Sequence, residues 1–125
     1  MSRAGLLKLA GGLFWAAAAF TLVMALLPKP PVPPGLAASD KVQHILAFFV
    51  LSLLAAAAFP RRGLVALFLG MALLGGLIEV LQMIPALNRD AEVMDWVADC
   101  VASLAALSAW FGARWLYRRR RDEAD

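Results

Sequence analysis

Four long apolar runs dominate the pattern of hydrophobic and polar positions along the chain. They cover residues 9–27, 42–59, 63–84 and 93–117, and most charged residues lie between or beyond them. About 20 apolar residues in a helix cross the roughly 30 Å hydrocarbon core of a bilayer. A segment in lipid must satisfy its own backbone hydrogen bonds, so each run is expected to be a helix. The pattern predicts an all-α, polytopic membrane protein: a single domain over residues 1–125, folded as an antiparallel bundle of four transmembrane helices.

Composition supports lipid as the solvent of this chain. Hydrophobic residues make up 62% of its 125 residues, against roughly 45–50% in soluble domains. A soluble domain of this size buries too small a fraction of its surface to hide so much apolar area. Cys100 is the single cysteine, so no intrachain disulfide can form, and its apolar surroundings indicate a packing residue.

The first run also has features of a signal peptide, because Arg3 and Lys8 precede it. Its apolar core is longer than the 7–15 residues of a typical signal peptide, and no small-x-small cleavage site follows. The next segment, residues 28–34, contains five prolines. We therefore expect a retained helix followed by a stiff, extended connector.

The distribution of basic residues predicts the orientation of the bundle. With four spans, both termini and the loop around residue 61 lie on one side of the membrane. That side holds nine of the twelve basic residues: Arg3, Lys8, Arg61, Arg62, Arg114 and Arg118 to Arg121. Positive charge favours the cytoplasmic side, so both termini are predicted to be cytoplasmic and residues 28–41 and 85–94 to face outward. The run 118–121 directly follows a span, which favours a membrane anchor over a nucleic-acid patch.

The remaining ionisable residues are predicted to converge near the outer face. The second span begins there, the third ends there and the fourth begins there, so groups far apart in sequence reach one depth. Pairs three or four residues apart share a helix face. The candidate residues are Asp40, Lys41, His44, Glu79, Gln82, Arg89, Asp95 and Asp99.

Glu79 is the most informative of these residues. It lies about 7–8 Å inside the third span, at 1.5 Å per residue from its end. A charge at that depth costs a few kcal/mol unless it is paired, protonated or hydrated, so it marks a candidate functional site. The alternative is a structural ion pair with Lys41 or Arg89. Gly75 and Gly76, one turn earlier, would open space beside Glu79.

An ordered set of motifs resembles the VanZ-like family of small membrane proteins. The motifs are Asp40-Lys41-x-x-His44 at the start of one span, Glu79-x-x-Gln82 at the end of the next, and Pro85, Arg89 and Asp95 before the last. The resemblance covers residues 40–107. Two features depart from the family pattern. Asp99 stands where the family usually has asparagine, which changes the charge, and Ala102 and Ala106 stand where it has glycines.

The resemblance implies a multi-pass protein of the bacterial inner (plasma) membrane with a role in the cell envelope and a link to teicoplanin resistance. Its outer-face pocket would bind a lipid head group or lipid-linked cell-wall precursor. In an enzymatic version, Glu79 or His44 would act as general base. Lys41 and Arg89 would hold an anionic group such as phosphate, with Asp40, Gln82, Asp95 and Asp99 completing the binding site.

Two alternatives stand beside this interpretation. The charges would lock the bundle of a non-catalytic structural or accessory protein, or Glu79 would serve a small proton-coupled exporter. The exporter ranks third, because the first span carries no acidic residue. A metal held by His44, Asp95 and Asp99 has weak support from one histidine and scattered acids, so no metal or other cofactor is predicted. No nucleic-acid partner is expected.

Overall fold

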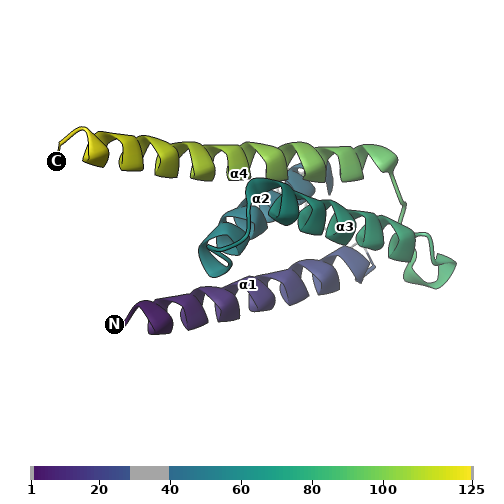
Figure 1. The fold of residues 1–125 in the computed structure, drawn as a ribbon. Coiled ribbons are helices and arrows are strands. Elements are labelled where there is room, and N and C mark those ends of the chain that lie inside the picture. The colour runs from purple at the N-terminus through teal and green to yellow at the C-terminus, as the bar shows by residue number, and fades with distance from the viewer. Residues whose placement is uncertain (1, 29–39, 125) are drawn as a thin grey trace.

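The computed structural model describes residues 2–28 and 40–124, and every regular element in these two ranges is helical. The helices are α1 (Arg3–Leu26), α2 (Asp40–Ala58), α3 (Leu64–Gln82) and α4 (Val93–Asp122), with a short 3-10 helix, η1 (Pro85–Leu87), before α4 (Figure 1). All four α-helices are long and apolar enough to cross a membrane. The predicted all-α class and the prediction of four helices of spanning length and composition are confirmed. Most of the predicted proline-rich connector lies outside the described residues.

The helix ends follow local rules more than the limits of the apolar runs. α1 begins at Arg3, before the apolar run, because Ser2 caps it: the Gly5 N–H donates to the Ser2 hydroxyl at 3.1 Å. α2 ends two residues before Pro60, and α3 ends three residues before Pro85, as expected where a proline disfavours helical geometry in the residue preceding it. α4 continues through its arginine run, and its 30 residues give it a length of about 45 Å.

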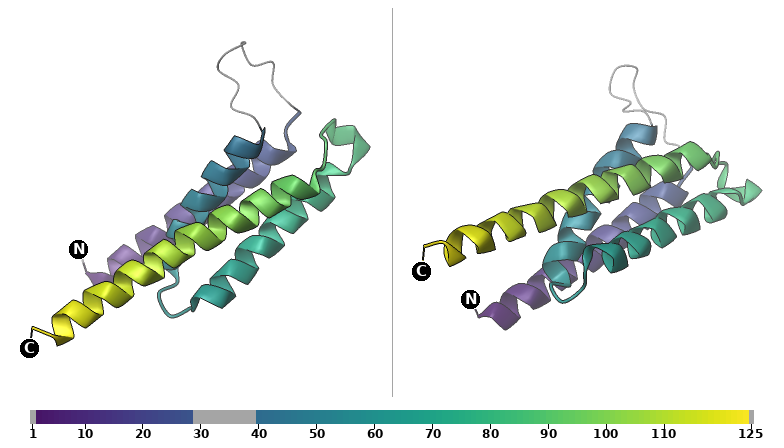
Figure 2. Two further views of the ribbon diagram at one scale, coloured as in Figure 1. Left: turned by 90° about the horizontal axis from the view of Figure 1, so that it is seen from above. Right: turned by 45° about the horizontal axis from the view of Figure 1, so that its top comes forward.

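The two ends of the bundle differ in character. The N-terminus, the C-terminus and the α2–α3 turn lie at one end (Figures 1 and 2). We call it the basic end, because Arg3, Arg61, Arg62, Arg114 and Arg118 line a hollow there. At the other end α1 and α3 finish, and α2 and α4 begin. We call it the polar end, and it holds the residues singled out in the sequence.

The main packing interface lies between α2 and α4, which run in the same direction. α3 packs on α4 and α1 packs on α2, whereas α2 and α3 touch little despite their short connection. The centre of the bundle is filled by Phe48, Leu51, Ile78 and Leu107, all almost fully buried. Consecutive helices are antiparallel, as predicted, but the most extensive contact joins two parallel helices. That contact carries the candidate site.

The outward faces of the helices are strongly apolar. Leu73 is 75% exposed, Trp15 is 65% exposed and Phe20 is 66% exposed. Of α1, Phe14 is the one residue that the described part of the bundle buries. Such faces would be unfavourable in water and suit a hydrocarbon solvent, in agreement with the spanning length of the helices.

Candidate functional site

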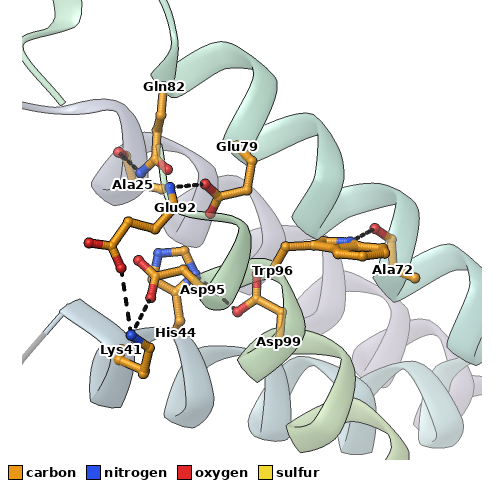
Figure 3. A network of polar contacts seen from close by, with 10 residues as sticks. All are labelled: Ala25, Lys41, His44, Ala72, Glu79, Gln82, Glu92, Asp95, Trp96 and Asp99. Carbon is orange, nitrogen blue, oxygen red and sulfur yellow. Dashed lines mark hydrogen bonds and ion pairs between the residues drawn. The ribbon is translucent and has the colours of Figure 1, made fainter. Parts of the chain in front are cut away.

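Two polar pairs join α2 to α4 at the polar end. Lys41 Nζ lies 3.4 Å from Asp95 Oδ1, and His44 Nδ1 lies 3.0 Å from Asp99 Oδ1 (Figure 3). The pairs are one helical turn apart on both helices, which is possible because α2 and α4 run in the same direction. Lys41 also lies 3.6 Å from Glu92 Oε2, at the exposed edge of the cluster. Lys41 and His44 share one face of α2, and Asp95 and Asp99 share one face of α4. These two faces are therefore partners of each other.

The His44–Asp99 pair is buried within the bundle. His44 is 8% exposed and Asp99 is completely buried. With Asp99 ionised and His44 neutral, the carboxylate can only accept, so the imidazole donates its Nδ1–H to Asp99 and keeps the Nε2 lone pair for another group. A carboxylate on one ring nitrogen fixes both the tautomer and the orientation of the ring. The sequence marked both residues, but it did not pair them.

Glu79 reaches the start of α4 from α3. Its Oε2 atom accepts a hydrogen bond from the Glu92 backbone N–H at 2.8 Å, and Glu92 is the N-cap residue of α4. The N-terminus of a helix carries partial positive charge and N–H groups without intrahelical acceptors, so it favours a carboxylate. The Lys41 ion pair that was considered for Glu79 goes instead to Asp95 and Glu92. The other oxygen of Glu79, Oε1, is buried without a hydrogen-bond partner in the described ranges.

Gln82 also lies on α3, but its side chain bonds to α1. Its Nε2 donates to the Ala25 carbonyl in the last turn of α1 at 3.0 Å, and the residue is 2% exposed. Carbonyls in the last turn of a helix lack intrahelical donors, so this bond satisfies one of them. Gln82 therefore fixes α1 to α3 beside the cluster. Asp40 is the first residue of α2, and its side chain lies outside the described part of the chain.

Close approach of α3 and α4 depends on Gly75. A Cβ atom at this position would lie 2.9 Å from Asp99 Oδ2 and 3.2 Å from Trp96 Cδ1. Trp96 in turn donates its indole N–H to the Ala72 carbonyl at 2.9 Å. The close approach that the glycines were predicted to allow beside Glu79 is found instead next to Asp99 and Trp96. Trp96 and Glu92 were not among the predicted site residues; in the sequence, their only signal is proximity to Asp95.

The ionisable groups of three helices meet in one place. His44, Glu79 and Asp95 each offer one potential ligand atom, and these three atoms all lie within 4.8 Å of one another. Asp95 is 4% exposed. In Figure 3 the imidazole lies among the carboxylates of Glu79, Asp95 and Asp99. The cluster combines residues that are 35 and 51 positions apart from His44 in sequence, and the topology that was predicted from the apolar runs brings them together.

A cavity of about 170 Å³ opens beside the cluster, between α1, α2 and the segment after η1. Its lining includes the polar residues His44, Gln43 and Arg89 and the apolar residues Phe20, Met24 and Phe48. Arg89 is held near this site by the turn at Asn88, which adopts a left-handed conformation with φ 49°. A polar group and a hydrocarbon segment can therefore bind side by side.

Two kinds of chemistry are open to this arrangement. An imidazole held by a carboxylate through Nδ1 can accept a proton at Nε2, which suits a general base. The same nitrogen can bind a metal ion, with neighbouring carboxylates as further ligands. Comparison of the chain with protein-family models, curated proteins and solved structures gave no match, so the site itself carries the functional argument.

Proposed function

We propose that this chain is a VanZ-like integral membrane protein of the bacterial cell envelope. It lies in the inner membrane with its polar end outward, and it binds the anionic head group of a lipid or lipid-linked cell-wall precursor. The observation that supports this function best is the cavity of about 170 Å³ beside the ionisable cluster. Its lining suits an amphiphile, because it combines a guanidinium, an amide and an imidazole with aromatic and aliphatic groups.

Arg89 and His44 are the residues suited to the head group. A guanidinium binds phosphate through two parallel hydrogen bonds, so Arg89 would supply affinity and orientation. The cavity is smaller than the 300–1,000 Å³ of typical ligand pockets, so it suits a head group with the first part of its chain. The rest of the chain would stay in the bilayer along the exposed apolar face of α1, which includes Phe20 and Met24.

Photocrosslinking tests this binding directly. The purified protein in nanodiscs is irradiated with a diazirine-bearing phosphatidylglycerol or a diazirine-bearing polyprenyl diphosphate, and the labelled residues are mapped by mass spectrometry. We expect crosslinks at Phe20, Met24 and Phe48 that Arg89→Gln reduces at least fivefold. Arg62→Gln, at the basic end, should leave them unchanged.

The outcomes separate the two sources of the anionic group. Crosslinks from only one probe identify a membrane lipid or a wall precursor as the ligand. Equal labelling of the cavity in wild type and in Arg89→Gln would refute the proposal that an anionic head group is recognised there.

A structural or accessory role is the second candidate, and one observation favours it. Four polar contacts of the cluster each join two helices: Lys41–Asp95, His44–Asp99, Glu79–Glu92 and Gln82–Ala25.

Expression in a teicoplanin-susceptible host distinguishes the envelope function from the structural role. We expect wild type to raise the inhibitory concentration and Glu79→Gln to abolish the increase at an equal protein level. If Glu79→Gln simply fails to accumulate, the structural role is supported instead.

A further inference from the structure

Three potential ligand atoms, one each from His44, Glu79 and Asp95, lie close together at the polar end. We propose that His44, Glu79 and Asp95 bind one divalent transition-metal ion, Zn²⁺ or Mn²⁺, and that Asp99 positions His44 for it. This inference goes beyond the proposed head-group binding and does not depend on it. It rests on the mutual distances of the ligand atoms, the orientation of the imidazole and the balance of charge in the cluster.

The distances are close to those that a metal requires. The three atoms lie within 4.8 Å of one another. Metal bonds of about 2.1 Å in tetrahedral geometry bring ligand atoms to about 3.4 Å from each other. Binding would require the Glu79 and Asp95 side chains, in the last turn of α3 and the first turn of α4, to move closer to His44. Three protein ligands leave further positions for water or a substrate oxygen.

The imidazole is arranged as metal-binding histidines usually are. His44 is more than nine-tenths buried, and its Nδ1–H donates to Asp99 at 3.0 Å. Within the described ranges this is the one hydrogen bond of the ring, so Nε2 is left for a ligand. A carboxylate behind a metal-bound histidine fixes the tautomer and raises the basicity of the ligating nitrogen. Asp99 is therefore a positioning residue, and it explains why a second buried acid lies next to His44.

Charge also favours a cation in this cluster. Asp95 and Asp99 are buried, and Glu79 has one oxygen without a hydrogen-bond partner among the described residues. Buried charges are normally paired or coordinate metals. Lys41 pairs with Asp95 and with the exposed Glu92, but its side chain is 45% exposed. An ion can displace it from Asp95, so Lys41 competes with the metal.

The donor set selects the class of metal. One imidazole nitrogen and two carboxylates suit Zn²⁺ or Mn²⁺, whereas Ca²⁺ and Mg²⁺ prefer oxygen ligands alone. The site contains no thiolate, which argues against Cu⁺ and iron–sulfur clusters. On this donor set Zn²⁺ should bind more tightly than Mn²⁺.

Metal titration of the full chain tests this site. The protein is purified in lipid-free detergent, stripped with a chelator and titrated with Mn²⁺, with binding followed by electron paramagnetic resonance. We expect one Mn²⁺ per chain, displaced by Zn²⁺. Spin-echo modulation from a ¹⁴N nucleus should report the imidazole ligand. Wild-type protein that binds no Mn²⁺, or binds it without nitrogen modulation, overturns the proposal.

Variants then assign the roles of the residues. His44→Ala should abolish the nitrogen modulation and specific binding. Asp99→Asn should weaken binding 10–100-fold while the nitrogen modulation of the bound ion remains, a combination that a purely structural role would not give. Lys41→Gln should tighten binding, and Glu92→Gln serves as the control for a carboxylate outside the ligand set. If Glu92→Gln weakens binding as much as Glu79→Gln, the assigned ligands are wrong.

Because the detergent contains no phospholipid, failure of the metal titration leaves the head-group proposal standing, and failure of the photocrosslinking leaves the metal site standing.

Discussion

At the scale of single residues, the two carboxylate oxygens of Glu79 have different surroundings. One oxygen accepts the backbone N–H at the start of α4, and the other is buried without a hydrogen-bond partner in the described structure. The first contact gives Glu79 a structural role, because it satisfies the backbone N–H of Glu92, the N-cap residue of α4, whose own side chain forms no cap hydrogen bond. The second oxygen is the part of the residue that the packing of the bundle does not explain.

Substitution of Glu79 separates these two contributions. Glu79→Gln keeps an oxygen that can accept the Glu92 N–H, whereas Glu79→Ala removes it. Loss of a helix cap costs about 0.5–2 kcal/mol, so Glu79→Ala should be less stable than Glu79→Gln by this amount. The free energy of unfolding in detergent, followed by circular dichroism, measures the difference.

Glu123→Gln is the matched control for this experiment. Glu123 pairs with Arg119 at 3.2 Å, exposed at the far end of α4. An exposed i,i+4 pair contributes only about 0.3–0.5 kcal/mol, so this variant should unfold nearly as wild type does. Equal stability of Glu79→Ala and Glu79→Gln would show that the cap contact is not formed in solution.

At the scale of helices, the α3–α4 contact depends on the absence of one side chain. Gly75→Ala places a Cβ atom 2.9 Å from Asp99 Oδ2 and 3.2 Å from Trp96 Cδ1, so these side chains or the helices that carry them must shift. Overpacking of this kind costs typically 1–3 kcal/mol, and it should weaken the Trp96–Ala72 hydrogen bond as well. We expect a lower melting temperature for Gly75→Ala in detergent.

Gly70 offers a control on the same helix. A Cβ atom there meets nothing within 4 Å, so Gly70→Ala should not lower the melting temperature. If the two alanine variants behave alike, the loss reflects alanine in α3 in general and not the close approach at Gly75.

The sequence predicts the helices well and their pairing poorly. The lengths of the apolar runs identify all four helices, and same-face spacing marks Asp95 and Asp99 as a unit. The partner of each side chain depends on how each helix is rotated about its axis, which a single sequence does not specify. For that reason the Lys41–Asp95 and His44–Asp99 pairs, the capping role of Glu79 and the bond from Gln82 to α1 appear only in the structure.

At the scale of the whole molecule, the bundle is electrically polarised along its axis. Five arginines line a hollow at the basic end, and the acidic cluster lies at the polar end. Positively charged segments are retained in the cytoplasm, so this polarity supports the proposed orientation. Anionic lipid head groups at the cytoplasmic surface would further stabilise the basic end.

Cysteine accessibility tests the orientation. In a Cys100→Ala background, a cysteine replacing Asn88, which is exposed at the polar end, should react in intact cells with a membrane-impermeant maleimide. A cysteine replacing Arg62 at the basic end should react only after the membrane is permeabilised. The reverse pattern would place the cluster in the cytoplasm and remove the basis for outward-facing ligand binding.

The pairing of α2 with α4 has a consequence for how the protein is made. α4 follows the other three helices along the chain, so Lys41 and His44 enter the membrane before Asp95 and Asp99 have been synthesised. Until then α2 carries polar groups without their final partners, which disfavours its stable residence in lipid. The nascent chain should therefore remain beside the translocation machinery until α4 arrives. A chain that ends before α4 should accumulate less than one that includes α4, because Lys41 and His44 would lack Asp95 and Asp99 as partners.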